Sequence, residues 1–352
     1  MSAQFIKKTA LLTLAIACAF QSGSALAKAF TEKDFQSQPL GHGVYELAYA
    51  SDQKAIYAAS APSFEKDKKA GLVFKLAADS LKIDEKISTA RRTFALSLDE
   101  ENHILWLGNA LEGSLTLLDT RTGKEIKTLQ LSDDADPTKI IHVREVVLDK
   151  KHQRLYVSGI GAKDKGLLWV VDTGKQQLAQ TLSNLDPVGF AVDTAGDKVY
   201  VVSGQGELIT LDGNTSRLLS RVKVDAAEPD HYFLNIALNT AAGVGYIADT
   251  NTRDVLVVQL DSGKLIQRIP TPNAIAVIYN AARDEVYVTH RNAREISVID
   301  AKSNAVKHTI NTTAMPNSLL LSPDAQTLYI SVKQDEKATQ ADYVLRIDLN
   351  TL

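Results

Sequence analysis

The fold is decided by residues 275–310, which read IAVIYNAARDEVYVTHRNAREISVIDAKSNAVKHTI. This stretch holds four runs of about five or six residues rich in Val, Ile, Thr and Tyr, separated by corners of Asn, Asp, Ser and Arg. Runs of this length and composition are typical of strands in an antiparallel meander, and each is too short for a helix. The stretch therefore predicts one four-stranded antiparallel sheet.

An aromatic residue in the second strand of this unit recurs along the chain. With spacings of 49, 50, 44, 46, 41 and 42 residues, the series is Tyr57, Trp106, Tyr156, Tyr200, Tyr246, Tyr287 and Tyr329. A period in the forties with four strands per unit is the signature of propeller blades. The sequence predicts an all-β, seven-bladed β-propeller of four-stranded antiparallel blades, in which the aromatic series packs one blade on the next.

Aspartates recur where the third strands end, at Asp119, Asp172, Asp212 and Asp300. Their short side chains accept hydrogen bonds from nearby backbone amides and close turns. We interpret them as corner residues and not as catalytic acids.

The last unit has three clear strands, near residues 318–322, 327–332 and 343–348. A ring of sheets leaves no open edge when a distant strand completes the final blade. We expect the N-terminal strand, within residues 29–38, to complete the last blade.

Residues 1–27 have the layout of a cleaved signal peptide, with Lys7 and Lys8 before an apolar run and Ala25-Leu26-Ala27 at its end. Lipoprotein processing at Cys18 is the alternative. A membrane span is not expected, because the apolar run is shorter than the roughly 20 residues that span a bilayer. Cleavage removes two lysines, no acidic residue and the only cysteine, so the formal charge goes from −3 to −5. We expect residues 28–352 to form a single propeller domain in the periplasm, without disulfides or membrane insertion, as a monomer.

No catalytic motif emerges from the chain. The glycines between Gly159 and Gly166 lack the helix that a phosphate-binding loop requires, and no two histidines have the four-residue spacing of a helical zinc site. We therefore expect a non-enzymatic protein without a cofactor. A metal-dependent hydrolase or lyase remains the alternative, because ligands from different blades can converge.

Propeller geometry brings the loops after the second and fourth strands to one funnel-shaped face. Although the protein is acidic, the candidate binding residues on these loops and strand ends are mainly basic: Arg91, Arg92, Arg144, His231, Tyr232, Asn235, His290, Arg291, Asn317 and Lys333. Arginine and lysine neutralise phosphates or carboxylates, and Tyr232 and Phe233 have faces for stacking. The funnel therefore suits an anionic strand, a small carboxylate or an acidic peptide.

Structural interpretations of the same residues stay open. Arg144 and Glu145 are candidates for an ion pair, Phe233 for the core, and Asn235 and Asn317 for bonds to backbone near the axis. The polar inserts 63–70 and 334–341 lie on the funnel face and are candidates for the rim of a partner site.

The Tyr-Val-Thr-His tetrad at residues 287–290 resembles propeller repeats named for Tyr-Val-Thr-Asn. Together with Tyr156-Val-Ser-Gly-Ile-Gly, Ser297-Val-Ile-Asp-Ala-Lys-Ser and Pro316-Asn-Ser-Leu, it resembles the periplasmic YncE family over nearly all of residues 28–352. The resemblance implies an exported seven-bladed propeller without catalytic activity. It also implies single-stranded DNA as a ligand, with an envelope protein partner linked to outer-membrane transport or iron physiology as the alternative.

Overall fold

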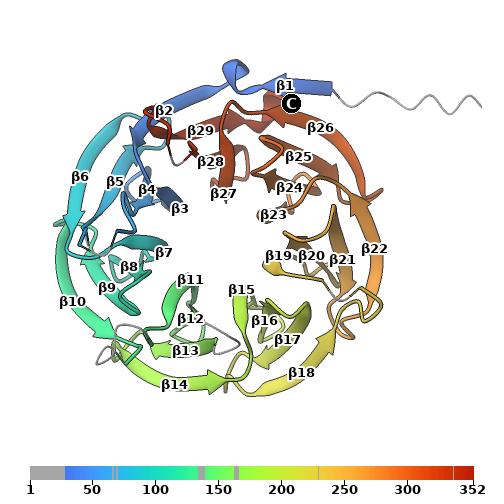
Figure 1. The fold of residues 1–352 in the computed structure, drawn as a ribbon, viewed down its shortest axis with the longest axis horizontal. Coiled ribbons are helices and arrows are strands. Elements are labelled where there is room, and N and C mark those ends of the chain that lie inside the picture. Colours follow the sequence, from blue (N-terminus) through green and yellow to red (C-terminus); the bar gives the residue numbers. More distant parts are fainter. Residues whose placement is uncertain are drawn as a thin grey trace, which may run out of the picture.

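The computed structural model describes residues 28–352 except 66, 69, 134–138, 162–165, 229 and 336. In this part of the chain, 29 strands form seven sheets around a central axis (Figure 1). The predicted signal peptide and Cys18 lie outside the described residues, as does part of the loop between Gly159 and Gly166. The described helices are two three-residue 3-10 turns, Glu32–Asp34 and Leu349–Thr351, and no helix among the described residues is long and apolar enough to cross a membrane.

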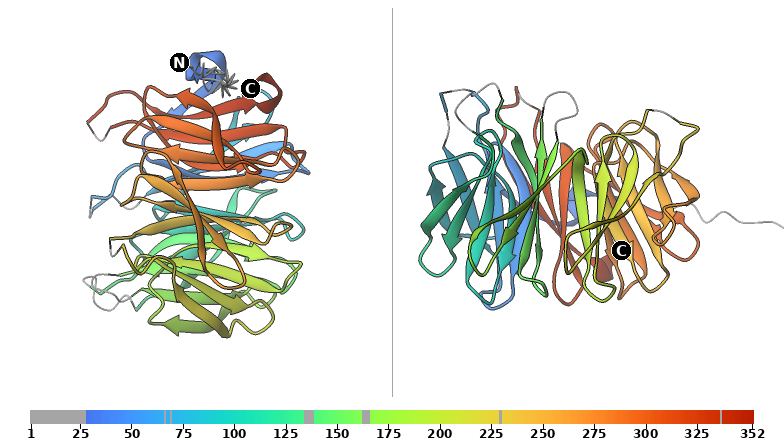
Figure 2. Two further views of the ribbon diagram at one scale, coloured as in Figure 1. Left: turned by 90° about the vertical axis from the view of Figure 1, so that its right-hand side faces the viewer. Right: turned by 90° about the horizontal axis from the view of Figure 1, so that it is seen from below.

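Each blade is a meander whose first strand lies at the axis and whose last strand lies at the periphery (Figures 1 and 2). The first blade consists of β3 (Val44–Ala50), β4 (Ala55–Ser60), β5 (Gly71–Ala77) and β6 (Ile83–Thr89). The second consists of β7 (Thr93–Asp99), β8 (Ile104–Asn109), β9 (Ser114–Asp119) and β10 (Lys124–Gln130). The third consists of β11 (His142–Asp149), β12 (Arg154–Ile160), β13 (Leu167–Asp172) and β14 (Gln177–Ser183). The fourth and fifth are β15 (Pro187–Asp193), β16 (Lys198–Ser203), β17 (Glu207–Asp212) and β18 (Leu218–Lys223); and β19 (Phe233–Asn239), β20 (Val244–Asp249), β21 (Asp254–Gln259) and β22 (Leu265–Pro270). The last two are β23 (Ala276–Asn280), β24 (Glu285–His290), β25 (Glu295–Asp300) and β26 (Ala305–Asn311); and β27 (Met315–Leu321), β28 (Thr327–Lys333) and β29 (Asp342–Asp348). The predicted seven-bladed architecture is confirmed.

The N-terminal segment completes the ring, as predicted, through β2 (Gln36–Gly41). This strand pairs antiparallel with β29 and becomes the outer strand of the seventh blade. The preceding β1 (Lys28–Thr31) pairs parallel with β26, so the sixth blade gains a fifth strand. The predicted range 29–38 therefore includes most of β1, a 3-10 turn and the start of β2. Its first part, in β1, pairs with the sixth blade and not with the last one.

The aromatic series packs between blades, as the sequence predicts. All seven side chains are buried, and they lie in apolar clusters that combine residues of adjacent blades. Several hydroxyls also donate to the following blade: Tyr57 Oη to the Thr120 carbonyl at 3.2 Å, and Tyr329 Oη to the Ala78 carbonyl at 2.8 Å. Each blade thus buries one aromatic residue, and in several blades its hydroxyl adds a polar contact to the neighbouring blade.

The corner aspartates close the turns between third and fourth strands. Asp172 Oδ1 accepts from the Lys175 amide at 2.8 Å, and Asp300 Oδ1 accepts from the Ser303 amide at 2.8 Å. Hydrogen bonds from Arg121 hold the pKa of Asp119 down to about 2. These contacts confirm the turn-closing role.

Candidate functional site

Many of the residues that face the channel lie at β-bulges in the first strands of the blades. Register shifts occur at Phe94 in β7, Arg144 in β11, Val188 in β15 and Leu234 in β19. Longer irregularities occur in β3 and β27, at the pairs Tyr45–Glu46 and Asn317–Ser318. A bulge inserts an unpaired residue and redirects its side chain, so these blades can place side chains into the channel that regular strands would not.

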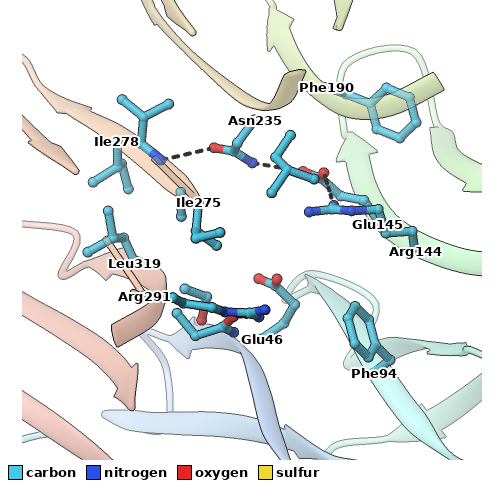
Figure 3. A pocket seen from close by; sticks show the side chains of 15 residues that line it. Glu46, Phe94, Arg144, Glu145, Phe190, Asn235, Ile275, Ile278, Arg291 and Leu319 are labelled. Atoms are coloured by element: carbon cyan, nitrogen blue, oxygen red, sulfur yellow. Dashed lines mark hydrogen bonds and ion pairs between the residues drawn. The ribbon is translucent and has the colours of Figure 1, made fainter. Parts of the chain in front are cut away.

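Several bulge residues, together with Arg291 and residues of β15 and β23, line a cavity of about 350 Å³ at the axis (Figure 3). Its charged and amide side chains are Glu46, Arg144, Glu145, Asn235, Arg291 and Asn317; its apolar wall includes Phe94, Phe190, Leu234, Ile275, Ile278 and Leu319. This volume lies at the lower end of the range of small-molecule sites. All seven blades contribute, because each places its first strand at the axis.

One polar group in the cavity joins the third and fifth blades. Arg144 Nη1 donates to Glu145 Oε2 at 3.0 Å and to the Val188 carbonyl at 3.3 Å. Asn235 Nδ2 donates to Glu145 Oε1 at 3.5 Å, and Asn235 Oδ1 accepts from the Val277 amide at 3.3 Å (Figure 3). The structure thus shows the Arg144–Glu145 pair, and Asn235 bonds to backbone as the structural interpretation expected.

A second polar group joins the sixth and seventh blades. Arg291 Nη2 donates to Asn317 Oδ1, and Asn317 Nδ2 donates to the Tyr45 carbonyl at 3.4 Å. The Arg291 Nε atom is buried and has no hydrogen-bond partner. Arg291 therefore has one hydrogen-bond donor that no described residue satisfies.

The two carboxyl groups resist ionisation in this channel. Burial raises the pKa of Glu145 to about 8, although Arg144 opposes the shift, and the nearby Glu46 adds to it. Burial likewise raises the pKa of Glu46, against the opposing effects of Arg144 and Arg291. Arginine stays protonated under all physiological conditions. Both shifts favour the neutral form of these carboxyl groups, which lessens the negative charge beside the two arginines.

Two of the predicted arginines lie outside the cavity lining. Arg92 is 3% exposed, pairs with Glu112 and donates from Nε to the Ser63 carbonyl at 3.0 Å. Arg91 Nη1 donates to Thr128 Oγ1 at 3.2 Å. Arg92 holds the loop after β4 against the second blade, which gives it a structural role.

Both predicted histidines are buried in hydrogen-bonded settings. His290 is 0% exposed, its Nε2 lies 2.9 Å from Ser297 Oγ, and desolvation lowers its pKa to about 4. His231 Nδ1 lies 2.5 Å from Asp249 Oδ2. His290 is therefore neutral at physiological pH, and neither histidine lines the cavity.

The remaining predicted residues lie around the cavity without lining it. Tyr232 is 37% exposed, whereas its neighbour Phe233 is 0% exposed and belongs to the core. Lys333 Nζ lies 3.4 Å from Asp342 Oδ2 and 3.7 Å from the centre of the Tyr45 ring, and burial lowers its pKa. Of the ten predicted residues, the structure brings Arg144, Asn235, Arg291 and Asn317 into the cavity.

Sequence reasoning missed Glu46 and Phe94, although the repeat contains a signal for both. Arg144 and Glu145 lie 12 and 11 residues before Tyr156, and Tyr45 and Glu46 lie at the same distances before Tyr57. Phe94 lies 12 residues before Trp106. Counting back from the aromatic series therefore finds most of the channel lining.

The comparisons with known proteins agree with this architecture. The chain is 38% identical over 319 residues to the uncharacterized protein YncE of Escherichia coli (strain K12), covering 88% of this chain and 89% of that protein. It is 35% identical over 325 residues to the uncharacterized protein YncE of Salmonella typhi, covering 90% and 91%. This chain belongs to the YncE family.

A family model described as outer membrane protein assembly factor BamB matches residues 111–351. Among solved structures, the β-propeller domain of Myceliophteria thermophila Cps50 (Swd1) aligns with a TM-score of 0.67 at 11% identity, covering 88% of this chain and 98% of that one. At this identity the likeness concerns the fold alone.

Proposed function

We propose that this YncE-family protein is a non-enzymatic, exported binding propeller that takes an anionic group into the mouth of its central channel. The observation that carries the proposal is the pair Arg144 and Arg291, which reach one cavity from the third and sixth blades. Planar guanidinium groups bind phosphates and carboxylates through two parallel hydrogen bonds. Single-stranded DNA is the candidate ligand, with a backbone phosphate or terminal phosphate at the channel mouth.

The state of the carboxyl groups supports an anion in this cavity. Burial raises the pKa of Glu145, and its contact with Arg144 lies within the cavity, so this carboxyl opposes an incoming anion less than an exposed glutamate would. Arg291 lines the same cavity, and its buried Nε–H has no hydrogen-bond partner among the described residues, so its charge is only partly compensated there.

Fluorescence anisotropy with a labelled single-stranded oligonucleotide at low and high salt tests the proposal. Arg144→Gln and Arg291→Gln should each weaken binding by roughly 5- to 20-fold and reduce the salt slope by about 1. Arg121→Gln is the matched control, because it removes the same charge from a turn on the opposite face, between β9 and β10. The proposal fails if the oligonucleotide does not bind at low salt, or if all three variants bind like the wild type.

A second candidate function is an envelope protein-interaction module, which the match to the BamB-described family model favours. The described residues of the inserts 63–70 and 334–341 follow second strands and so lie on the same face as the channel mouth. Crosslinking in intact cells should capture a defined partner, and shortening both inserts should abolish the capture. A metal-dependent hydrolase or lyase has less support, because the described residues contain no group of three or more potential metal-ligating side chains.

A further inference from the structure

Three aromatic side chains form a ledge at the edge of the channel cavity. The Tyr45 and Phe94 ring centres lie 4.2 Å apart, and Phe64 lies 6.0 Å from Tyr45 and 6.5 Å from Phe94. Phe94 lines the cavity, whereas Phe64 is 42% exposed. The aromatic ledge, defined as Tyr45, Phe64 and Phe94, therefore runs from the cavity wall to the surface.

Hydrogen bonds from Arg92 hold the backbone on both sides of Phe64, the exposed member of the ledge. Arg92 donates to the carbonyls on either side of Phe64, from Nε to Ser63 at 3.0 Å and from Nη2 to Glu65 at 2.5 Å. Arg92 itself is buried and paired with Glu112. A buried ion pair thus fixes the backbone that presents an exposed phenylalanine.

The seventh blade holds the second member of the ledge. The Tyr45 carbonyl accepts from the hydroxyls of Ser318 at 2.7 Å and Ser331 at 2.6 Å. Lys333 Nζ lies 3.7 Å from the Tyr45 ring centre. Because these contacts exist before any ligand arrives, binding on the ledge costs little ordering of the protein.

The exposure of Phe64 differs in kind from that of other large apolar residues. The exposed aliphatic side chains lie on the peripheral fourth strands: Ile126, Leu178, Leu218, Leu219 and Ile266. Phe64 instead contacts two further aromatic rings next to a cavity that holds two arginines. Its surroundings combine a flat apolar surface with positive charge.

The geometry points to a subsite for a planar aromatic ring that is joined to an anionic group, with the ring on the aromatic ledge and the anion at the channel arginines. This inference rests on the proposed function, because the anion occupies the same cavity. Aromatic rings pack on one another in offset or edge-to-face arrangements that a saturated ring cannot reproduce. A carboxylate and a phosphate satisfy the arginines through the same chemistry.

Four small probes test the subsite by ligand-observed NMR and calorimetry: 3-phenylpropionate, phenyl phosphate, 3-cyclohexylpropionate and the neutral 3-phenylpropionamide. The wild type should bind the two aromatic anions most tightly, and Phe64→Ala should weaken both by roughly 3- to 10-fold. Phe64→Tyr should restore binding, whereas Phe64→Leu should not. Leu218→Ala, which removes another exposed apolar side chain, from β18, is the control and should bind like the wild type.

The outcomes separate the two proposals. Equal binding by wild type and Phe64→Ala, or full restoration by Phe64→Leu, overturns the ledge while the anion site stands. Equal binding of 3-phenylpropionate and 3-phenylpropionamide overturns the anion site. If Phe64→Ala weakens the binding of both probes, the ring site still stands. If no probe binds, the ring subsite fails, and the proposed function is then decided by the oligonucleotide experiment alone. If the aromatic anions bind, the ranking of carboxylate against phosphate identifies the source of the anion.

Discussion

The surfaces between blades and the lining of the channel are built from the same repeat by different rules. Between blades, each unit contributes a buried aromatic residue at the same position, and several of the tyrosines donate to the next blade. At the axis, most blades break their strand register, and the side chain at the break differs from blade to blade: Phe94, Arg144, Leu234 or Asn317. The constant positions maintain the ring, and the variable positions are free to determine what it binds.

The largest expected effect concerns closure of the ring. Deleting residues 28–41 removes β1 and β2 and leaves β29 as an open edge, so we expect the melting temperature to fall by more than about 10 °C. Deleting only residues 28–31 removes β1 and should cost much less, because the seventh blade stays complete. Calorimetry of both truncations checks the order, and an unchanged melting temperature after the longer deletion would contradict the closure.

A pair of substitutions compares the two regions directly. Trp106→Ala should destabilise the protein by about 3 to 5 kcal/mol, because it empties a fully buried site between blades. Phe94→Ala, at the channel, should cost about 1 kcal/mol or less in stability while weakening the aromatic probes. Urea denaturation measures both values. Equal destabilisation would show that the channel lining is as structural as the interfaces.

A smaller effect concerns how the buried channel carboxyl makes the stability of the protein depend on pH. Glu145 has a pKa of about 8 in the folded protein against an ordinary value of 4.5, so the folded state holds this proton more tightly than the unfolded state. The wild type should lose stability as the pH rises from 4.5 towards 8, whereas Glu145→Gln should lack this component. Between pH 4.5 and 8, the difference in unfolding free energy between the wild type and Glu145→Gln should change by roughly 2 to 4 kcal/mol. Parallel pH profiles of stability in the two proteins would refute the assignment.

The sequence predicted the fold because its evidence is repeated. Seven aromatic residues at similar spacings, and turn-closing aspartates between them, each report the same local structure, so an error in one blade is corrected by the others. The closing strand was placed only approximately. Strands β1 (KAFT) and β2 (QSQPLG) both mix polar and apolar residues, and nothing in their composition distinguishes the blade that each one pairs with.

The site was harder to predict because side-chain direction depends on the bulges. Four of the ten predicted residues line the cavity, whereas Arg92 and His290 come from the same funnel face but point into hydrogen-bonded packing. Glu46 and Phe94 escaped notice because regular strand alternation says nothing about residues inserted at a register shift.

The sequence by itself determined the seven-bladed ring, since strand periodicity, turn chemistry and the buried aromatic series are local properties repeated along the chain. Only the tertiary structure decided which polar residues share the channel. Arg144 and Arg291 are separated by 147 positions (291 − 144), and they approach one cavity because the closed ring brings the third and sixth blades to a common axis. The desolvation that raises the pKa of Glu145 arises from that same convergence and from no segment alone.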